Sequence, residues 1–98
     1  MDFDPQIGYE QKGRRPALVI SNNIFSKFSN LTIVCPITNT AKDHPFYVKL
    51  NGTKTTGTIL CTQIKALDVI ARNFQFIETI PNDILFEVID IVKGFIEI

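Results

Sequence analysis

The apolar positions of the chain follow two periods, which separate several short strands from one terminal helix. Apolar and polar residues alternate over 46–50, the period of a half-buried strand. Apolar runs bounded by turn residues predict further strands over 17–20, 31–37, 57–61, 64–69 and 74–80. Residues 4–14 hold Pro5, Gly8 and Gly13 with one aliphatic side chain, so they predict a long loop. Residues 24–30 predict a turn region that could form one helical turn around Ile24, Phe25 and Phe28, and residues 39–45 a polar loop.

The period changes after Pro81, where apolar residues recur at steps of one, three and four. This spacing predicts an amphipathic helix over 82–96. Pro81 is expected at its first position, where a missing N–H costs nothing, with Asn82 or Asp83 as the cap. Short strands followed by one helix predict a mainly β fold with α, a small antiparallel β-barrel with the helix packed on it. The predicted barrel core is Leu18, Ile20, Ile33, Phe46, Val48 and Leu50.

Composition and charge narrow the possible functions. With 98 residues, 45% of them hydrophobic, the chain predicts a single domain over 1–98. Ten Lys and Arg balance ten Asp and Glu, so an anion site must come from local clustering. No apolar run approaches the ~20 residues of a membrane helix, and no signal peptide is recognisable, so we expect a cytoplasmic protein. Cys35 and Cys61 form no CxxC motif and there is one His, so we expect inert buried cysteines and no metal site.

The tightest basic cluster is Lys12, Arg14 and Arg15, preceded by Glu10. A guanidinium suits bidentate contact with phosphate, although a solvated charged loop is the simpler interpretation of these residues alone. Thr38 follows a predicted strand, where its hydroxyl could donate to a phosphate oxygen or belong to an ordinary turn. The basic cluster and this hydroxyl are the candidate anion-binding groups.

Three further polar residues are less specific. His44 is the one side chain with a usual pKa near neutrality, but it precedes Pro45 in a predicted loop, which favours an exposed loop residue. Gln63 and Lys65 lie between two apolar runs, where they could line a groove or cover a solvent face.

Taken together, these segments resemble the MazF/PemK-type toxin family of bacterial toxin–antitoxin modules. The run G-x-E-Q-x-G-x-R-P ahead of an apolar strand is the most specific part of the match. The matching segments are Asp2-Phe3-Asp4-Pro5, Gly8 to Pro16, the apolar strand to Ser21, Pro36-x-Thr38, Pro45-Phe46, Gln63-x-Lys65 and the closing helix.

The resemblance implies a homodimeric, sequence-specific endoribonuclease that cuts single-stranded RNA without a metal or other cofactor. It implies an SH3-like barrel of the CcdB/MazF type, with Arg15 and Thr38 as the catalytic pair and Glu10 as a third member. The implied products are a 2′,3′-cyclic phosphate and a 5′-hydroxyl, and the implied partner is an antitoxin with an acidic C-terminal segment. The expected RNA-binding residues are Lys12, Arg14, Asn39, Gln63 and Lys65.

Two departures from the family pattern leave alternatives open. Thr62 stands where many members have an acidic residue, and the family's usual first strand, which precedes the Asp-Phe-Asp-Pro segment, is missing. We therefore expect a natural start codon upstream of Met1. The alternatives are an inactive truncated homologue, or a non-catalytic toxin of the same fold that traps a topoisomerase.

Overall fold

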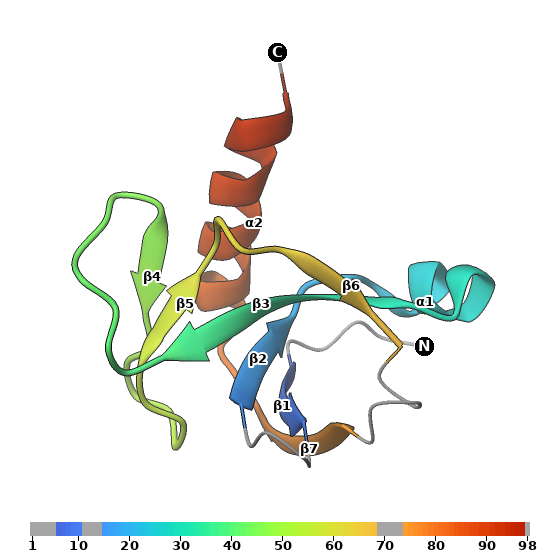
Figure 1. The fold of residues 1–98 in the computed structure, drawn as a ribbon, viewed down its shortest axis with the longest axis horizontal. Coiled ribbons are helices and arrows are strands. Elements are labelled where there is room, and N and C mark those ends of the chain that lie inside the picture. Colours follow the sequence, from blue (N-terminus) through green and yellow to red (C-terminus); the bar gives the residue numbers. More distant parts are fainter. Residues whose placement is uncertain (1–5, 11–14, 69–73, 98) are drawn as a thin grey trace.

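The computed structural model describes residues 6–10, 15–68 and 74–97 (Figure 1). In chain order the elements are β1 (Gln6–Glu10), β2 (Arg15–Val19), α1 (Asn23–Ser29), β3 (Thr32–Thr38), β4 (Tyr47–Lys49), β5 (Thr58–Leu60), β6 (Lys65–Leu67), β7 (Phe74–Thr79) and α2 (Asn82–Ile96). The predicted combination of short strands and one long terminal helix is confirmed.

The described strands form one antiparallel sheet with β3 at its centre. The strand order is β4-β5-β3-β2-β1-β7, and β6 also pairs with β3. The β2 ladder occupies one edge of β3, whereas β5 and β6 pair successively along the other edge. The predicted antiparallel β fold with a terminal helix is confirmed, and within the described residues no ladder joins β4 to β7, so the curved sheet of this small barrel is open. In Figure 1, α2 stands against the β4 side of this sheet.

The loop predicted over residues 4–14 is wrong for residues 6–10, which form β1. This strand pairs with β2 on one edge and with β7 on the other, and its register against β7 shifts between Ile7 and Gly8. The extra residue of this β-bulge lies in β7, because Ile77 falls between the partners of Ile7 and Gly8. The backbone pairing along both edges of β1 outweighs the weak strand propensity of Gly8 and of the polar residues in this segment, because strand formation depends strongly on tertiary context.

Two asparagines enclose a helix where we predicted a turn region. The side chain of Asn22 accepts a hydrogen bond from the Phe25 N–H at 2.9 Å. Asn30, with φ of 61°, ends α1 in the left-handed conformation and donates to the Ser26 carbonyl. None of the seven helical residues is buried, and Phe28 is 82% exposed. Capping therefore defines this helix, which carries no core side chain.

The C-terminal helix has the predicted bounds but a different N-terminal cap. Pro81 is the N-cap rather than the first helical residue, because its ψ of 143° is extended. Its carbonyl accepts the Ile84 N–H at 3.2 Å. Asn82 is already helical, so the predicted side-chain cap by Asn82 or Asp83 is wrong. Asp83 instead places its charge in the first turn, near the positive end of the helix dipole.

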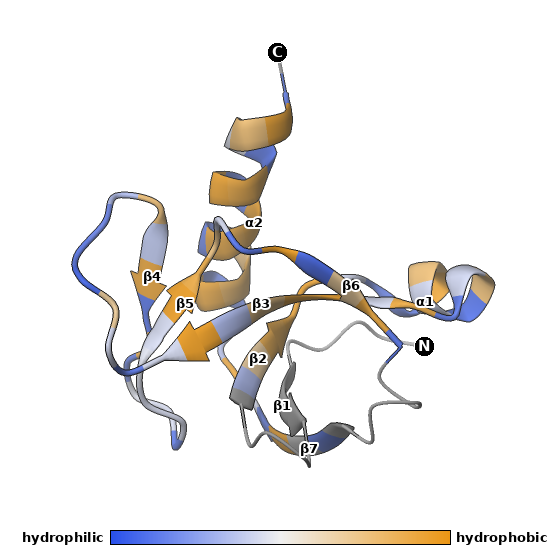
Figure 2. Ribbon diagram, in the orientation of Figure 1, coloured by the Kyte–Doolittle hydropathy of each residue, from blue (hydrophilic) through white to orange (hydrophobic). Residues whose placement is uncertain are grey.

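Four residues of α2 are buried in the core: Ile84, Leu85, Val88 and Val92. Of the predicted core, Leu18 and Val48 are buried, whereas Ile20, Ile33 and Leu50 are half-buried. The prediction for Phe46 is wrong, because it is 44% exposed and meets Phe95 edge to face, with ring centroids 5.0 Å apart. In Figure 2 most of the visible ribbon of α2 is orange, interrupted by separate blue positions.

Both cysteines are fully buried in this core, as predicted. Burial, together with the nearby Cys61, raises the pKa of Cys35 to about 12. Burial is also the main reason that the pKa of Cys61 rises to about 11. Both thiols therefore stay protonated at neutral pH and are poor nucleophiles. Among the described residues, no helix is both long and apolar enough to cross a membrane.

The buried and exposed faces of α2 predict different losses of stability when single side chains are replaced by alanine. Leu85→Ala should lower the free energy of unfolding by about 2–5 kcal/mol, because it leaves a cavity in the core. Phe86→Ala, at a neighbouring residue that is 60% exposed, should change it by less than about 0.5 kcal/mol. Urea unfolding of both variants measures the difference, and equal losses would show that α2 presents another face to the sheet.

Candidate functional site

Thr38 lies at the C-terminal end of β3, between two ladders. On one edge it pairs directly with Thr58 of β5. On the other edge Ala17 pairs with Pro36, and continuing that register by two residues aligns Arg15 with Thr38. Opposite residues in antiparallel strands have Cα atoms about 5 Å apart. The register thus aligns the two predicted catalytic positions, although 22 residues separate them in the sequence.

The same row continues onto β1, where Glu10 pairs with Arg15. Glu10, Arg15 and Thr38 therefore occupy successive backbone positions across three neighbouring strands. The row continues in the other direction through Thr58 to Lys49 of β4. On this row a guanidinium and a hydroxyl can donate to the oxygens of a phosphodiester, and a carboxylate can accept a proton.

Local hydrogen bonds hold the Thr38 side chain at the end of the strand. Its Oγ1 lies 3.0 Å from the Thr40 Oγ1 and accepts the Thr40 N–H at 3.3 Å. The neighbouring Asn39 is exposed, and its Oδ1 accepts the Thr56 hydroxyl at 3.1 Å. These contacts connect the end of β3 to the loop between β4 and β5.

That loop approaches Thr38 so closely that it requires a glycine at position 57. Gly57 has φ of 127°, and a Cβ there would lie 2.8 Å from the Thr38 carbonyl oxygen. The Gly57 carbonyl also accepts the Leu50 N–H at 2.9 Å. Sequence reasoning placed Gly57 only at the start of a strand and missed this role, because the pattern around it does not show which backbone it meets.

Glu78 of β7 fixes the other side of the same loop. Its carboxylate accepts the Thr55 N–H at 2.6 Å and the Lys54 N–H at 3.1 Å. Desolvation opposes the ionised form of Glu78, but the hydrogen bonds from Thr55 and Lys54 and the charge of Lys54 outweigh it and lower the pKa. The only sequence signal of this role is that Glu78 interrupts the alternation of its strand.

The remaining predicted RNA-binding residues lie farther from Thr38 or outside the described structure. Lys65 of β6 pairs with Val34, which is about 13 Å along β3 from Thr38. Gln63 lies in the turn before β6, and both side chains are exposed. Lys12 and Arg14 fall outside the described residues, and Glu10 and Arg15 are placed here by their backbone alone. The structure therefore groups Thr38 with Asn39 and separates Gln63 and Lys65 from them.

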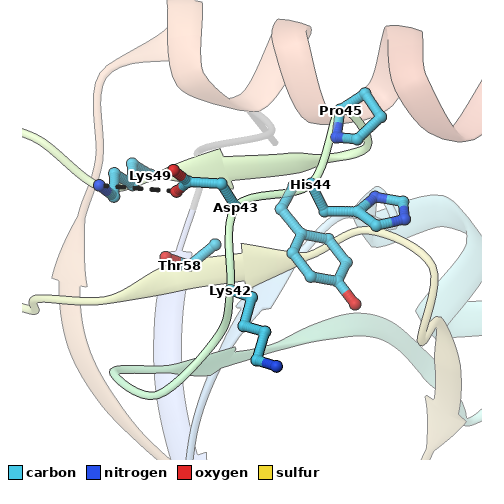
Figure 3. Close-up of a pocket in the computed structure, with 7 residues that line it drawn as sticks. Lys42, Asp43, His44, Pro45, Lys49 and Thr58 are labelled. Atoms are coloured by element: carbon cyan, nitrogen blue, oxygen red, sulfur yellow. Dashed lines mark ion pairs between the residues drawn. The ribbon is translucent and has the colours of Figure 1, made fainter.

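A pocket of about 390 Å³ opens at the end of the row formed by Thr58 and Lys49 (Figure 3). Its lining is Lys42, Asp43, His44, Pro45, Tyr47, Lys49 and Thr58. The His44 side chain is exposed, as predicted, and its Nδ1 accepts the Phe46 N–H at 3.1 Å. Sequence reasoning did not find this pocket, because its walls come from a loop and two strands. In the described ranges, no three His, Cys, Asp or Glu residues gather as metal ligands.

Comparison with protein families gives one match over nearly the whole chain. The model described as PemK-like, MazF-like toxin of type II toxin-antitoxin system matches residues 1–96. Endoribonuclease PemK of Escherichia coli is 35% identical over 94 residues, covering 91% of this chain and 71% of that protein. Endoribonuclease toxin MazF of Escherichia coli strain K12 is 38% identical over 72 residues, covering 74% of this chain and 65% of that protein.

Solved structures agree with this match. MazE-MazF of Deinococcus radiodurans superposes with a TM-score of 0.85 at 28% identity, covering 97% of this chain and 95% of that one. MazF alone from the same organism gives a TM-score of 0.84 at 29% identity, covering 100% of this chain and 97% of that one. The open sheet with its terminal helix is therefore the fold of these proteins.

The contact at Gly57 predicts a strained variant. Gly57→Ala should lower the free energy of unfolding by more than about 1 kcal/mol, since an alanine resists this φ and its methyl group meets the Thr38 carbonyl. Gly94→Ala is the matched control, because a Cβ there meets nothing within 4 Å inside a helix, and it should stabilise by about 0.5–1 kcal/mol. Urea unfolding that ranked the two variants equally would contradict this close approach.

The lowered pKa of Glu78 predicts a loss of stability in acid. Its bonds contribute fully above the unfolded-state pKa, about 4.3, and are lost as pH falls through the lower folded-state pKa. Glu78→Gln should therefore flatten the dependence of the unfolding free energy on pH between about pH 5 and pH 2. Urea unfolding over this range measures the slope. Glu97→Gln, at the end of α2, is the control, and an equal effect of both variants would contradict the prediction.

Proposed function

Since the chain belongs to the PemK-like, MazF-like toxin family of type II toxin–antitoxin systems and is an endoribonuclease toxin, we propose that it cuts single-stranded mRNA in a sequence-specific manner without a metal ion. Such cleavage would inhibit translation and growth. The observation that carries the proposal is the row of Glu10, Arg15 and Thr38 across three strands. The family resemblance points to the same three residues on the basis of sequence motifs alone, independently of the fold.

The proposed reaction uses the RNA's own 2′-hydroxyl as the nucleophile, a group that DNA lacks. Its oxygen attacks the adjacent phosphorus, the bond from phosphorus to the 5′-oxygen breaks, and a 2′,3′-cyclic phosphate and a 5′-hydroxyl result. One proton leaves the 2′-hydroxyl and one is delivered to the 5′-oxygen. This route needs no metal-bound water, because the substrate supplies the nucleophile.

We assign Arg15 and Thr38 to the phosphate, where negative charge accumulates in the transition state. Preorganised donors at such oxygens usually make the largest contribution to catalysis. The Thr38 hydroxyl is held by Thr40, which favours this role. Arginine stays protonated in proteins, so Arg15 can stabilise or protonate the leaving oxygen but is a poor base. Glu10, next to Arg15 in the row, is the proposed base.

The proposed RNA path runs along β3. Asn39 lies beside Thr38, and Gln63 and Lys65 lie along the same edge of β3 as β5. These positions suit an extended single strand that follows β3 rather than a compact substrate. Lys12 and Arg14 complete the proposed RNA-binding set.

The cognate partner is an antitoxin, in keeping with the family and with the MazE-MazF structures from Deinococcus radiodurans. We propose that an acidic C-terminal segment of that antitoxin binds across Lys12, Arg14 and Arg15 and folds as it binds. We also propose a symmetric homodimer, since one self-complementary patch is enough to form it. A cytoplasmic location, where mRNA is available, belongs to the same proposal.

A binding toxin that traps a topoisomerase would share the fold but would cut nothing. The two Escherichia coli relatives reported above are named endoribonucleases, so this alternative is not favoured. Incubation of the purified protein with a long RNA and EDTA separates the possibilities. Discrete fragments support the nuclease, whereas intact RNA would support a binding toxin or an inactive homologue.

Loss of either phosphate-binding group predicts a large fall in rate. Arg15→Ala and Thr38→Ala should each lower kcat by about 10²–10³, as at other oxyanion sites, while the fold survives. Thr38→Ser keeps a hydroxyl and should retain most of the activity. His44→Ala should not abolish cleavage. Single-turnover cleavage of an RNA oligonucleotide, with thermal unfolding as a folding check, measures these effects.

The substrate provides the control for this mechanism. A 2′-deoxy nucleotide at the cut position should block cleavage completely, because the nucleophile is absent. Cleavage of that substrate, or a requirement for added Mg²⁺, would contradict the proposed reaction.

A further inference from the structure

The pocket beside Thr58 has an aromatic wall formed by two stacked rings. The His44 and Tyr47 ring centroids lie 4.6 Å apart with an angle of 29° between the ring planes. Pro45 adds a further apolar surface, and the volume of about 390 Å³ lies within the range of small-ligand sites. Flat apolar walls of this kind suit a planar, aromatic ligand.

The pocket lies one strand away from the proposed catalytic hydroxyl. Thr58 lines the pocket and pairs directly with Thr38, so their Cα atoms lie about 5 Å apart. Directly paired residues project from the same face of a sheet, which places both threonine side chains on one face. The loop that starts after Thr38 also supplies Lys42, His44 and Pro45 (Figure 3). A ligand in the pocket would therefore lie next to the scissile phosphate.

The polar groups of the pocket suit a base attached to a phosphate chain. Because His44 Nδ1 accepts the Phe46 N–H, a neutral His44 ring carries its proton on Nε2 and donates from there. Lys49 lies 4.0 Å from Asp43, and both side chains are largely exposed. Asp43 thus offsets the charge of Lys49, one of the two lysines of the pocket. The charge of Lys42 is then available to the phosphate backbone of a bound RNA strand.

We propose that this pocket holds one nucleobase of the RNA next to the cut, stacked on the His44–Tyr47 ring pair, with Lys42 near its phosphate. The assignment rests on the proposed endoribonuclease function and adds a substrate-binding subsite to it. Stacking is available to every base, so the subsite contributes mainly affinity and positions the strand over Thr38.

The experiment combines protein variants with substrate changes. The wild-type protein first maps the cut in a long RNA, and a short oligonucleotide around that cut is made with a 2′-deoxy nucleotide at the cut position. Because this RNA is not cleaved, fluorescence anisotropy reports its Kd alone. His44→Ala should raise Kd about 10-fold through loss of stacking. On the cleavable RNA it should raise KM by a similar factor, because a binding contact is lost.

Three further variants separate stacking from folding effects. His44→Asn keeps a side-chain acceptor for the Phe46 N–H without the ring and should behave like His44→Ala. His44→Phe keeps a ring and should restore most of the affinity. Phe28→Ala removes an exposed aromatic ring from α1 and should bind like the wild type. Thermal unfolding of each variant shows whether it is folded.

Abasic nucleotides locate the base. At one position next to the cut, an abasic site should make the wild type and His44→Asn bind equally, whereas at other positions their difference should persist. Equal Kd values for the two proteins on the intact RNA, or a difference that no abasic position removes, would overturn the subsite alone. Failure of the wild type to cut any RNA would instead overturn the proposed function, and the subsite with it.

Discussion

The antiparallel register of β3 is the constraint on which the rest of the site depends. β3 pairs with β2 on one edge and with β5 on the other, so Thr38 faces Thr58 on one side, and the extended β2 register aligns it with Arg15 on the other. Strand pairing allows no intermediate register, because a slip of one residue would turn every side chain to the other face. The core fixes the register in turn, since Cys35 and Ile37 must stay buried. Burial of apolar side chains therefore positions the polar row.

The loop between β4 and β5 connects this row to the far edge of the sheet. Gly57 lets the loop backbone lie against the Thr38 carbonyl, and Thr56 bonds to Asn39. Glu78 holds Thr55 from β7, an element that pairs with β1 rather than with β3. The end of β3 thus contacts the loop between β4 and β5, and β7 in turn holds that loop. Such support restricts the motion of a hydroxyl that must meet a phosphate oxygen in one geometry.

The accuracy of the sequence predictions differed between elements for physical reasons. The period of α2 identified Leu85 and Val88 correctly, because a helix alone determines which residues share a face. Phe46 has a similar apolar signal, yet it lies just before β4, where contact with Phe95 of α2 covers it only in part. Gly8 suggested a loop, yet β1 forms there because β2 and β7 satisfy its backbone. Whether a strand lies at the edge of the sheet, and which strands it pairs with, depends on the assembled sheet. A local sequence pattern cannot show either.

The sequence by itself determined the family, the short strands, the terminal helix and the residue types of the candidate site. These follow from local periodicity and from the spaced motif around Glu10, Arg15 and Thr38. Only the tertiary structure decided that β3 aligns these positions, that Gly57 abuts Thr38 and that a pocket opens beside Thr58. Each of these features joins segments that are distant in the chain. Which segments meet depends on strand register and core packing, which a linear pattern does not encode locally.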